Sequence, residues 1–224
     1  MFKVIFLDAE GTFLKFNPSL GRIYSNLWSE YDIRIDEEIV AQKMRKLHKE
    51  IFQAKLGGIN LNGEICKEGW RKVFEETFFS LREHPNFNDV FEKAYAFFSS
   101  PECVKVVSEF NHFLREVKTL DIKLAIISNW DSRLYSVLKG HNLISQFEAI
   151  FLGCEVGYLK PHLEIFKRAL SYFKVKPKEA LMIGDSWEDD IEPAQKLGIP
   201  FFYVKETFPS LEEIKRTYFK FSGH

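Results

Sequence analysis

The sequence predicts an α/β fold: a doubly wound parallel sheet with a second, smaller, all-helical domain inserted after the first strand. Short apolar runs with almost no polar alternation recur along the chain, which is typical of strands covered on both faces of a parallel sheet. Amphipathic stretches of helical period separate the last four runs, and such strand–helix alternation indicates parallel pairing. Between the first run and the second, residues 8–123 contain no strand-like run, so this stretch is too long for a simple crossover.

The expected elements follow from these periods. Strands are expected at residues 2–7, 124–127, 149–152, 181–183 and 201–204. Helices of the sheet domain are expected at residues 105–117, 132–139, 161–173 and 191–197, with a surface helix after Pro209. The insert has helical period at residues 17–31, 36–56, 67–82 and 87–98, broken at Pro18, Gly57, Gly58, Gly63 and Pro85. We therefore assign residues 1–13 and 97–224 to a Rossmann-like core and residues 14–96 to a helical cap.

Composition excludes several classes of protein. The 224 residues are 46% hydrophobic and 28% charged, which excludes a disordered, collagen-like or membrane-embedded chain. Lys and Arg number 31 against 32 Asp and Glu, so no overall field attracts nucleic acid or an anionic membrane. The apolar run at residues 2–7 is too short for a signal peptide or a membrane span.

The cysteines suggest a cellular address. Cys66, Cys103 and Cys154 are far apart and lack any metal-binding spacing, so we interpret them as buried, reduced thiols. The expected protein is cytoplasmic, a monomer or homodimer, and binds neither nucleic acid nor membrane.

Polar motifs follow the expected strands at their carboxyl ends, where open α/β sheets bind ligands. The first is Asp8-Ala9-Glu10-Gly11-Thr12. A carboxylate directly after a buried strand is unfavourable unless it is paired, hydrogen-bonded or bound to a cation. Capping of turn amides is an equally simple interpretation of Asp8 and Glu10 taken alone.

The other three motifs are similar in kind. Ser128-Asn129 can cap the next helix or hold an anion at its start. Lys160 before Pro161 is, taken alone, typical of a solvated surface charge. The fourth motif, Gly184-Asp185-Ser186, continues into Glu188, Asp189 and Asp190, an acidic cluster that an oxygen-ligated divalent cation would stabilise. Four such motifs at four strand ends make separate structural explanations improbable.

Together these groups predict phosphoryl-transfer chemistry. An aspartate can act as a nucleophile, and a second carboxylate can exchange a proton with the leaving oxygen and with water. Mg²⁺ would be held by Asp8, Asp185 and substrate oxygens. Lys160, Ser128 and Asn129 would neutralise the phosphoryl oxygens. The predicted function is a Mg²⁺-dependent phosphohydrolase that acts on a small phosphorylated metabolite.

The four motifs, in this order and spacing, resemble those of the haloacid dehalogenase superfamily of aspartate-nucleophile hydrolases. The insert is placed and sized like the helical C1-type cap of subfamily I. The chain further resembles one small branch of the superfamily, at Pro18, Gly21, Tyr24, Trp70 and the run at residues 127–131.

The resemblance implies a role for each matching residue. Asp8 is the expected nucleophile and metal ligand, and Glu10 the general acid and base, with its backbone carbonyl on the metal. The expected phosphate contacts are Thr12, Ser128 and Asn129, with Lys160 orienting nucleophile and phosphate. Asp185 is the expected acidic metal ligand, and Asp189 and Asp190 hold the metal's waters and position Lys160.

One residue departs from the family pattern. Phosphatases of the superfamily carry Asp two residues after the nucleophile, whereas this chain has Glu10. The longer side chain displaces the acid, and a shift of roughly 1 Å can reduce the rate by ~10²-fold. Two alternatives therefore stay open: a metal-independent 2-haloacid dehalogenase, and a catalytically weak module that binds a phosphorylated ligand or a protein. Candidate substrate contacts on the cap are Arg22, Tyr24, Arg45 and the loop at residues 57–62, whereas Trp28 and Trp70 are expected to pack between helices.

Overall fold

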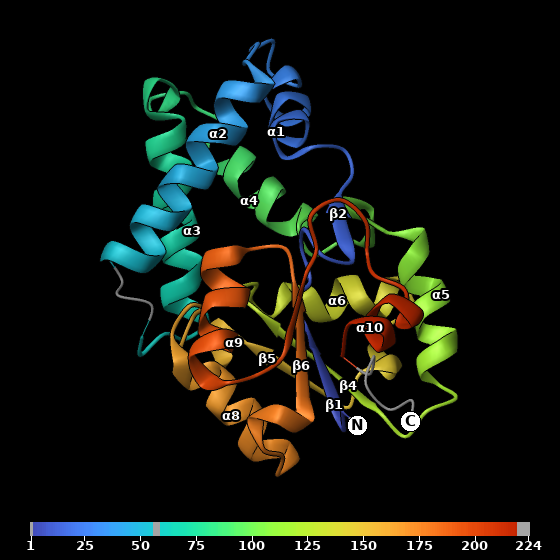
Figure 1. Cartoon of the computed structure of the whole chain (residues 1–224). Coiled ribbons are helices and arrows are strands. Elements are labelled where there is room, and N and C mark those ends of the chain that lie inside the picture. The colour runs from blue at the N-terminus through green and yellow to red at the C-terminus, as the bar shows by residue number, and fades with distance from the viewer. Residues whose placement is uncertain (1, 56–58, 219–224) are drawn as a thin grey trace, which may run out of the picture.

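A five-stranded, all-parallel sheet lies at the centre of the computed structural model, which describes residues 2–55 and 59–218 (Figure 1). The strand order is β5-β4-β1-β6-β7, with β1 in the middle. The strands are β1 (Val4–Leu7), β4 (Lys123–Ser128), β5 (Ala149–Leu152), β6 (Ala180–Gly184) and β7 (Phe201–Tyr203). The predicted α/β class is confirmed, and every expected strand is present within a few residues.

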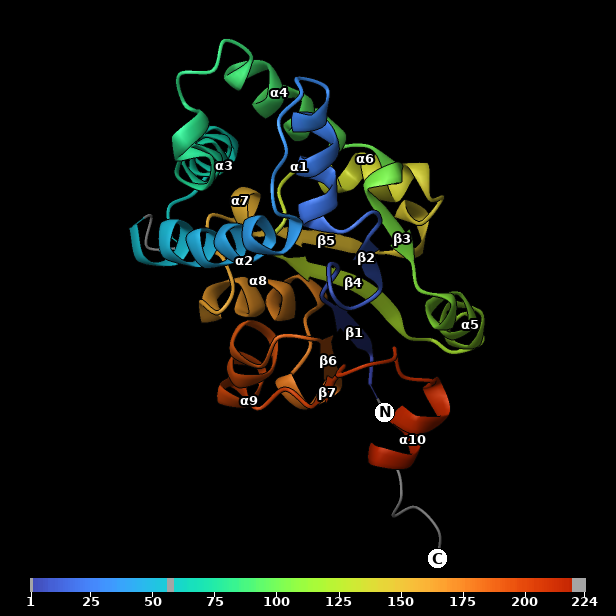
Figure 2. The same ribbon diagram turned by 90° about the horizontal axis from the view of Figure 1, so that it is seen from above.

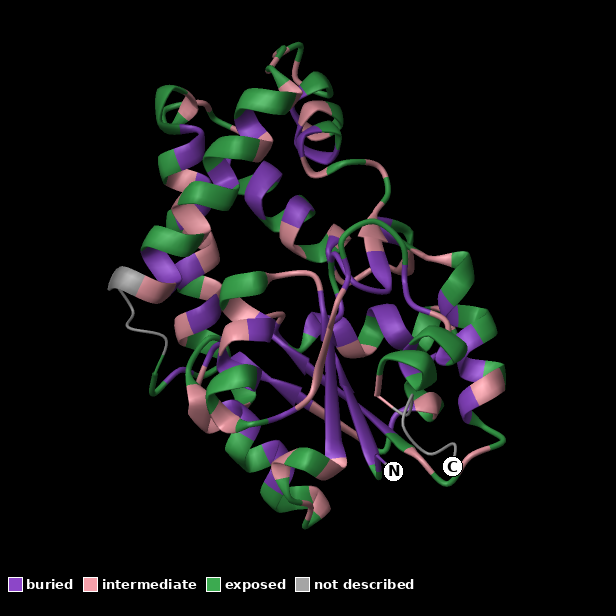
Figure 3. Cartoon of the chain, viewed as in Figure 1, coloured by how far each residue is buried: buried purple, intermediate pink, exposed green. Residues whose placement is uncertain are grey.

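Helices cover both faces of the sheet, which explains the unbroken apolar runs (Figures 1 and 2). Ile5 and Leu7 of β1 pack toward α5 (Ser108–Val117), α6 (Arg133–Gly140) and α10 (Leu211–Tyr218). Val4 and Phe6 pack toward α8 (Leu163–Phe173) and α9 (Glu192–Leu197) on the opposite face. Figure 3 shows the central strands buried throughout. A one-turn helix, α7 (Gly153–Val156), follows β5.

The cap consists of four helices above the carboxyl ends of the strands (Figure 1). They are α1 (Leu20–Ser29), α2 (Glu37–His48), α3 (Gly63–Thr77) and α4 (Phe87–Phe97), and α2 continues as π-helical turns over Lys49–Lys55. Residue 56, where the second cap helix was expected to end, and Gly57 and Gly58 lie outside the described residues. The side chains of Ser19, Asp36 and Asn62 accept backbone N–H groups and begin three of these helices.

A short antiparallel ribbon joins cap and core, and the sequence did not predict it. β2 (Leu14–Phe16) pairs with β3 (Val104–Val106) where the chain leaves and re-enters the core. The expectation of no strand between the first and second apolar runs is therefore wrong, and the helix expected at residues 105–117 begins only at Ser108. Strands of three residues are too short for a period to be visible, and tertiary pairing decides their conformation.

The expectation that all three cysteines are reduced is also wrong. Cys66 on α3 and Cys154 on α7 form a disulfide, with Cα atoms 6.2 Å apart. Only Cys103 is a free, buried thiol. The bonded pair is separated by 88 residues, and sequence spacing carries no information about contacts made by helix packing across two domains. The disulfide joins cap to core, and it removes the argument from reduced cysteines to a reducing compartment.

No helix in residues 2–55 and 59–218 has the length and apolar character needed to cross a bilayer.

Candidate active site

The register of the parallel sheet brings the predicted motifs to one edge. Leu7 lies opposite Ile126 of β4 and Ile183 of β6. The residues that follow these positions therefore emerge side by side, and the Asp8 amide donates to the Ile183 carbonyl at 2.9 Å. This register explains why motifs far apart in the sequence form one site.

Lys160 lies at the centre of the site, so the alternative interpretation as a solvated surface charge, which applied to the residue taken alone, is wrong. Its side chain is 2% exposed, and Nζ lies 2.6 Å from Oδ1 of both Asp8 and Asp190. Burial alone would lower the pKa of Lys160, but the carboxylates of Asp190 and Asp8 outweigh it and raise the pKa. The Asn129 side chain fixes the Lys160 backbone, accepting from its N–H at 2.7 Å and donating to its carbonyl at 2.9 Å.

Two motif glycines allow the carboxylates to approach the backbone. Gly11 has a φ of +89°, and a Cβ there would lie 2.2 Å from Oδ2 of Asp185. A Cβ on Gly184 would lie 2.3 Å from Oδ2 of Asp190. A larger residue at either position would displace a carboxylate of the site.

The carboxylates form a cluster suited to a hard cation. Asp8, Asp185 and Asp190 each offer an oxygen, and these oxygens lie within 4.8 Å of one another. Burial, followed by repulsion from Asp8, raises the pKa of Asp185 to about 6. Burial also raises the pKa of Asp190, against the opposing effect of Lys160. Lys160 pairs with two of the three carboxylates, Asp8 and Asp190, and the set of oxygen donors fits Mg²⁺.

Asp189 and Asp190, which the sequence left unresolved, have different surroundings. Asp190 is fully buried, pairs with Lys160, and accepts from the Ser186 amide at 3.0 Å. Asp189 instead accepts a hydrogen bond from Gln53 of the cap at 3.1 Å. Asp190 is therefore the residue that positions Lys160, whereas Asp189 connects the site to the cap.

The predicted phosphate contacts are placed differently from one another. The Thr12 hydroxyl is buried and lies 3.1 Å from both Asp8 Oδ2 and Asp185 Oδ1, so its single proton can be donated to either carboxylate. Ser128 lines the cavity, and its Oγ accepts from the Trp130 amide at 3.2 Å. Because the Asn129 side chain is engaged by Lys160, its backbone N–H is the group left for an anion.

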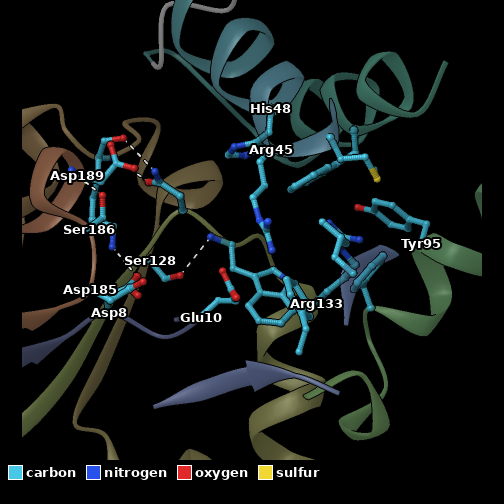
Figure 4. Close-up of a pocket in the computed structure, with 18 of the residues that line it drawn as sticks. Asp8, Glu10, Arg45, His48, Tyr95, Ser128, Arg133, Asp185, Ser186 and Asp189 are labelled. Atoms are coloured by element: carbon cyan, nitrogen blue, oxygen red, sulfur yellow. Dashed lines mark hydrogen bonds and ion pairs between the residues drawn. The ribbon is translucent and has the colours of Figure 1, made fainter. Parts of the chain in front are cut away.

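Glu10 faces the cavity and stands apart from the Asp8–Asp185 pair (Figure 4). Its side chain is exposed to water in the cavity. The cap and the core nevertheless surround the cavity, and this reduces the solvation of the carboxyl group. Burial, then repulsion from Asp8 and Asp185, raises the pKa of Glu10 to about 7, against Arg45 and Lys15. A carboxyl group with this pKa can both donate and accept a proton near neutral pH.

A cavity of about 310 Å³ lies between the cap and the strand ends. Of the candidate cap contacts, Tyr24 and Arg45 line it, whereas Arg22 forms an ion pair with Glu37 at 3.0 Å. Trp28 is fully buried among cap helices, as expected. Trp70 packs against His48 and Phe52, as expected, and it also lines the cavity.

Sequence analysis missed several lining residues. Arg133 is 8% exposed, binds Asp131 through Nε at 2.8 Å, and lies 3.9 Å from the ring centre of Tyr95. His48 stacks on Trp70 with ring centres 4.8 Å apart. The pair Asp131 and Arg133, directly after the second motif, was a usable signal, whereas His48 and Tyr95 lie on amphipathic helices where nothing marks them.

Comparison with known proteins agrees with this geometry. A family model for haloacid dehalogenase-like hydrolases matches residues 7–204. The chain belongs to this family. Bovine (Bos taurus) haloacid dehalogenase-like hydrolase domain-containing protein 3 is 26% identical over 199 residues, covering 88% of this chain and 79% of the relative. This bovine protein belongs to the small branch of the superfamily that Pro18, Gly21, Tyr24, Trp70 and residues 127–131 of this chain resemble.

Solved structures of the family share the fold. The magnesium-bound putative hydrolase YfnB of Bacillus subtilis has a TM-score of 0.77 at 18% identity, covering 96% of this chain and 98% of that one. L-2-haloacid dehalogenase from Xanthobacter autotrophicus, with chloropropionic acid covalently bound, has a TM-score of 0.70 at 20% identity, covering 99% and 84%. Since both resemble this chain, the fold alone does not select the substrate bond that is cleaved.

Proposed function

We propose that this hydrolase is a Mg²⁺-dependent phosphatase that acts on a small phosphorylated metabolite through an aspartyl-phosphate on Asp8. One observation carries the proposal: the Lys160 ammonium joins the carboxylates of Asp8 and Asp190, and an Asp185 oxygen lies within 4.8 Å of both carboxylates. A phosphoryl group arriving at Asp8 brings further negative charge, which this acidic site accepts only together with a cation.

Each residue has a chemical role in this scheme. Lys160 and Thr12 each hold one oxygen of Asp8, which fixes the nucleophile in one orientation. An Asp8 oxygen bonds to phosphorus while the bond from phosphorus to the alcohol oxygen breaks, and Glu10 donates a proton to that oxygen. Water then attacks phosphorus with Glu10 as base, releasing phosphate and restoring Asp8. Mg²⁺, held by Asp8 and Asp185, would neutralise charge on the phosphoryl oxygens.

The second candidate is a metal-independent 2-haloacid dehalogenase, in which Asp8 would displace halide from carbon. The Asp185–Asp190 cluster favours the phosphatase, because displacement of halide by a carboxylate requires no cluster of acidic metal ligands. The Xanthobacter relative nevertheless makes this candidate worth an experiment.

The test measures hydrolysis of 4-nitrophenyl phosphate with Mg²⁺ and with excess chelator, and halide release from 2-chloropropionate. We expect phosphate release only with Mg²⁺. Asp8→Asn should abolish it while the melting temperature stays close to wild type, since the amide is nearly isosteric. The control, Asp121→Asn, changes an exposed aspartate far from the site and should keep full activity. Halide release that persists in chelator would instead establish the dehalogenase, and phosphate-mimic binding without turnover would establish a binding module.

A further inference from the structure

The two halves of the cavity differ in chemistry. Its floor, from the strand ends, carries the carboxylates and Lys160. Its upper walls are mostly aromatic or apolar, built from the cap, the ribbon and the loop after β4. The apolar and aromatic residues are Phe16, Leu20, Tyr24, Met44, His48, Trp70, Phe91, Tyr95, Phe98 and Trp130. A substrate with its phosphate on the floor therefore places the rest of the molecule among rings.

Arg45 is the exception in the upper half. It extends from α2 into the cavity above Glu10 (Figure 4). Among the residues that the structure describes, it makes no ion pair and no side-chain hydrogen bond. Arg45 lies near enough to Glu10 to lower its pKa, but no ion pair or hydrogen bond joins the two side chains in the described residues.

The other basic groups around the cavity are occupied. Arg133 binds both oxygens of Asp131, at 2.8 Å each. Lys160 is held by Asp8 and Asp190. Lys49, one position after His48, pairs with Glu188. Arg45 is thus the cavity's available cation in the described part of the chain.

We propose that the substrate is a phosphate monoester whose alcohol part is a flat, aromatic body bearing a second anionic group, and that Arg45 binds this group. The proposal rests on the phosphatase function and specifies its substrate class. A cavity of about 310 Å³ is at the small end for ligand sites, which suits a single ring with its substituents. Rings of the cap can pack face-on or edge-on against such a body, and the planar guanidinium pairs with two oxygens of a carboxylate or phosphate.

The experiment uses two substrates of equal shape: 4-carboxyphenyl phosphate and its neutral amide, 4-carbamoylphenyl phosphate. We expect wild type to favour the carboxylate in kcat/KM by about tenfold or more, equal to about 1.4 kcal/mol or more. Arg45→Gln should remove most of this preference, mainly through KM, and Arg45→Lys should restore part of it. Lys46→Gln removes a neighbouring positive charge whose ion pair with Glu50 faces solvent, and it should keep the preference. A second set of measurements uses 1,4-phenylene bisphosphate. Its kcat/KM, compared with that of 4-carboxyphenyl phosphate, shows whether Arg45 favours a phosphate or a carboxylate as the second anionic group.

Several outcomes would overturn the proposal. Equal losses on both substrates in Arg45→Gln would mean that Arg45 serves the phosphoryl group or Glu10. Equal kcat/KM for 3-carboxypropyl and 4-carboxyphenyl phosphate would contradict the aromatic body. If no phosphate ester is hydrolysed, calorimetry with the benzylphosphonate analogues of the pair distinguishes the two proposals. If the carboxylate analogue then binds more tightly than the amide, and this difference depends on Arg45, the proposed class of ligand is supported although the proposed phosphatase activity is not. If the two analogues bind equally, the proposed class of ligand is overturned as well.

Discussion

Glu10 occupies the position at which the phosphatases that the motifs resemble carry Asp. Its carboxyl group faces the cavity, and a pKa raised to about 7 suits a group that donates and accepts protons. We expect Glu10→Gln to reduce kcat/KM most for alkyl phosphates, because their poor leaving groups need the proton. Aryl phosphates should lose less, and Glu10→Asp should retain or raise kcat.

Glu68→Gln, on the exposed surface of the cap, is the matched control for this series. The measurement is kcat/KM for one alkyl and one aryl phosphate in all four proteins. A loss in Glu10→Gln that is the same for both leaving groups would contradict proton transfer by Glu10.

Lys160 makes a prediction about stability as well as rate. Lys160→Ala should abolish turnover and, because it leaves Asp8 and Asp190 buried without their partner, destabilise the fold by about 3 kcal/mol at pH 7.5. Burial already raises the pKa of Asp190. In the variant the folded state binds more protons there than the unfolded chain, so the destabilisation should shrink as pH falls.

Urea unfolding at pH 7.5 and 5.5 measures this effect. Lys196→Ala, which breaks an exposed ion pair with Glu192, should change stability by less than about 0.5 kcal/mol. A Lys160→Ala protein as stable as that control would show that the buried pairs contribute nothing to the fold.

The cap wall formed by α2 and α3 predicts a pH dependence at the level of elements. His48 packs against both Phe52 and Trp70, which also contact each other, and burial lowers the pKa of His48 to about 4. The unfolded chain has a His pKa of about 6.5. Between these values the unfolded state binds a proton that the folded state does not, so stability is complete above about pH 6.5 and falls as pH drops toward 4.

His48→Phe should remove this contribution. The loss of unfolding free energy between pH 7.5 and 5 should be smaller in the variant than in wild type by up to about 2 kcal/mol. His112→Gln, an exposed histidine on α5, is the control and should follow wild type. Identical pH profiles for wild type and His48→Phe would contradict a neutral His48 in the folded cap.

For the molecule as a whole, the sequence predicted what depends on local pattern. Buried strands appeared in the sequence as apolar runs, and Asp8 and the Gly184-Asp185 motif came at their ends. The parallel sheet and the position of the site therefore followed from the rule that ligands bind at the carboxyl ends of parallel strands, whereas the strand order was not predicted. Depth of burial was not visible: Lys160 next to Pro161 had the pattern of a surface residue. Contacts made only by tertiary packing were not predictable either, including the β2–β3 ribbon and the role of Arg133 against Tyr95.

The Cys66–Cys154 disulfide is the clearest of these tertiary contacts, since it is a covalent link between cap and core in addition to the backbone of the ribbon. It closes a segment of 88 residues in the unfolded chain. Such a link contributes typically about 2–4 kcal/mol, and for a chain of this size each kcal/mol changes the melting temperature by about 2–4 °C. Reduction should therefore lower the melting temperature by about 4–16 °C.

Reduction should also loosen α3 where it meets the core. There the remaining contacts include the Leu61 amide on the Gly157 carbonyl, at 3.3 Å, and the bridge between Ile59 and Tyr158. We expect backbone amides of α3 and residues 59–62 to exchange hydrogen faster after phosphine treatment, while β1 exchanges as before. The double variant Cys66→Ser/Cys154→Ser should have the melting temperature and the α3 exchange rates of reduced wild type, and phosphine treatment should change neither. Wild type whose melting temperature and α3 exchange do not respond to reduction would show that the ribbon and the noncovalent contacts alone hold the cap in place.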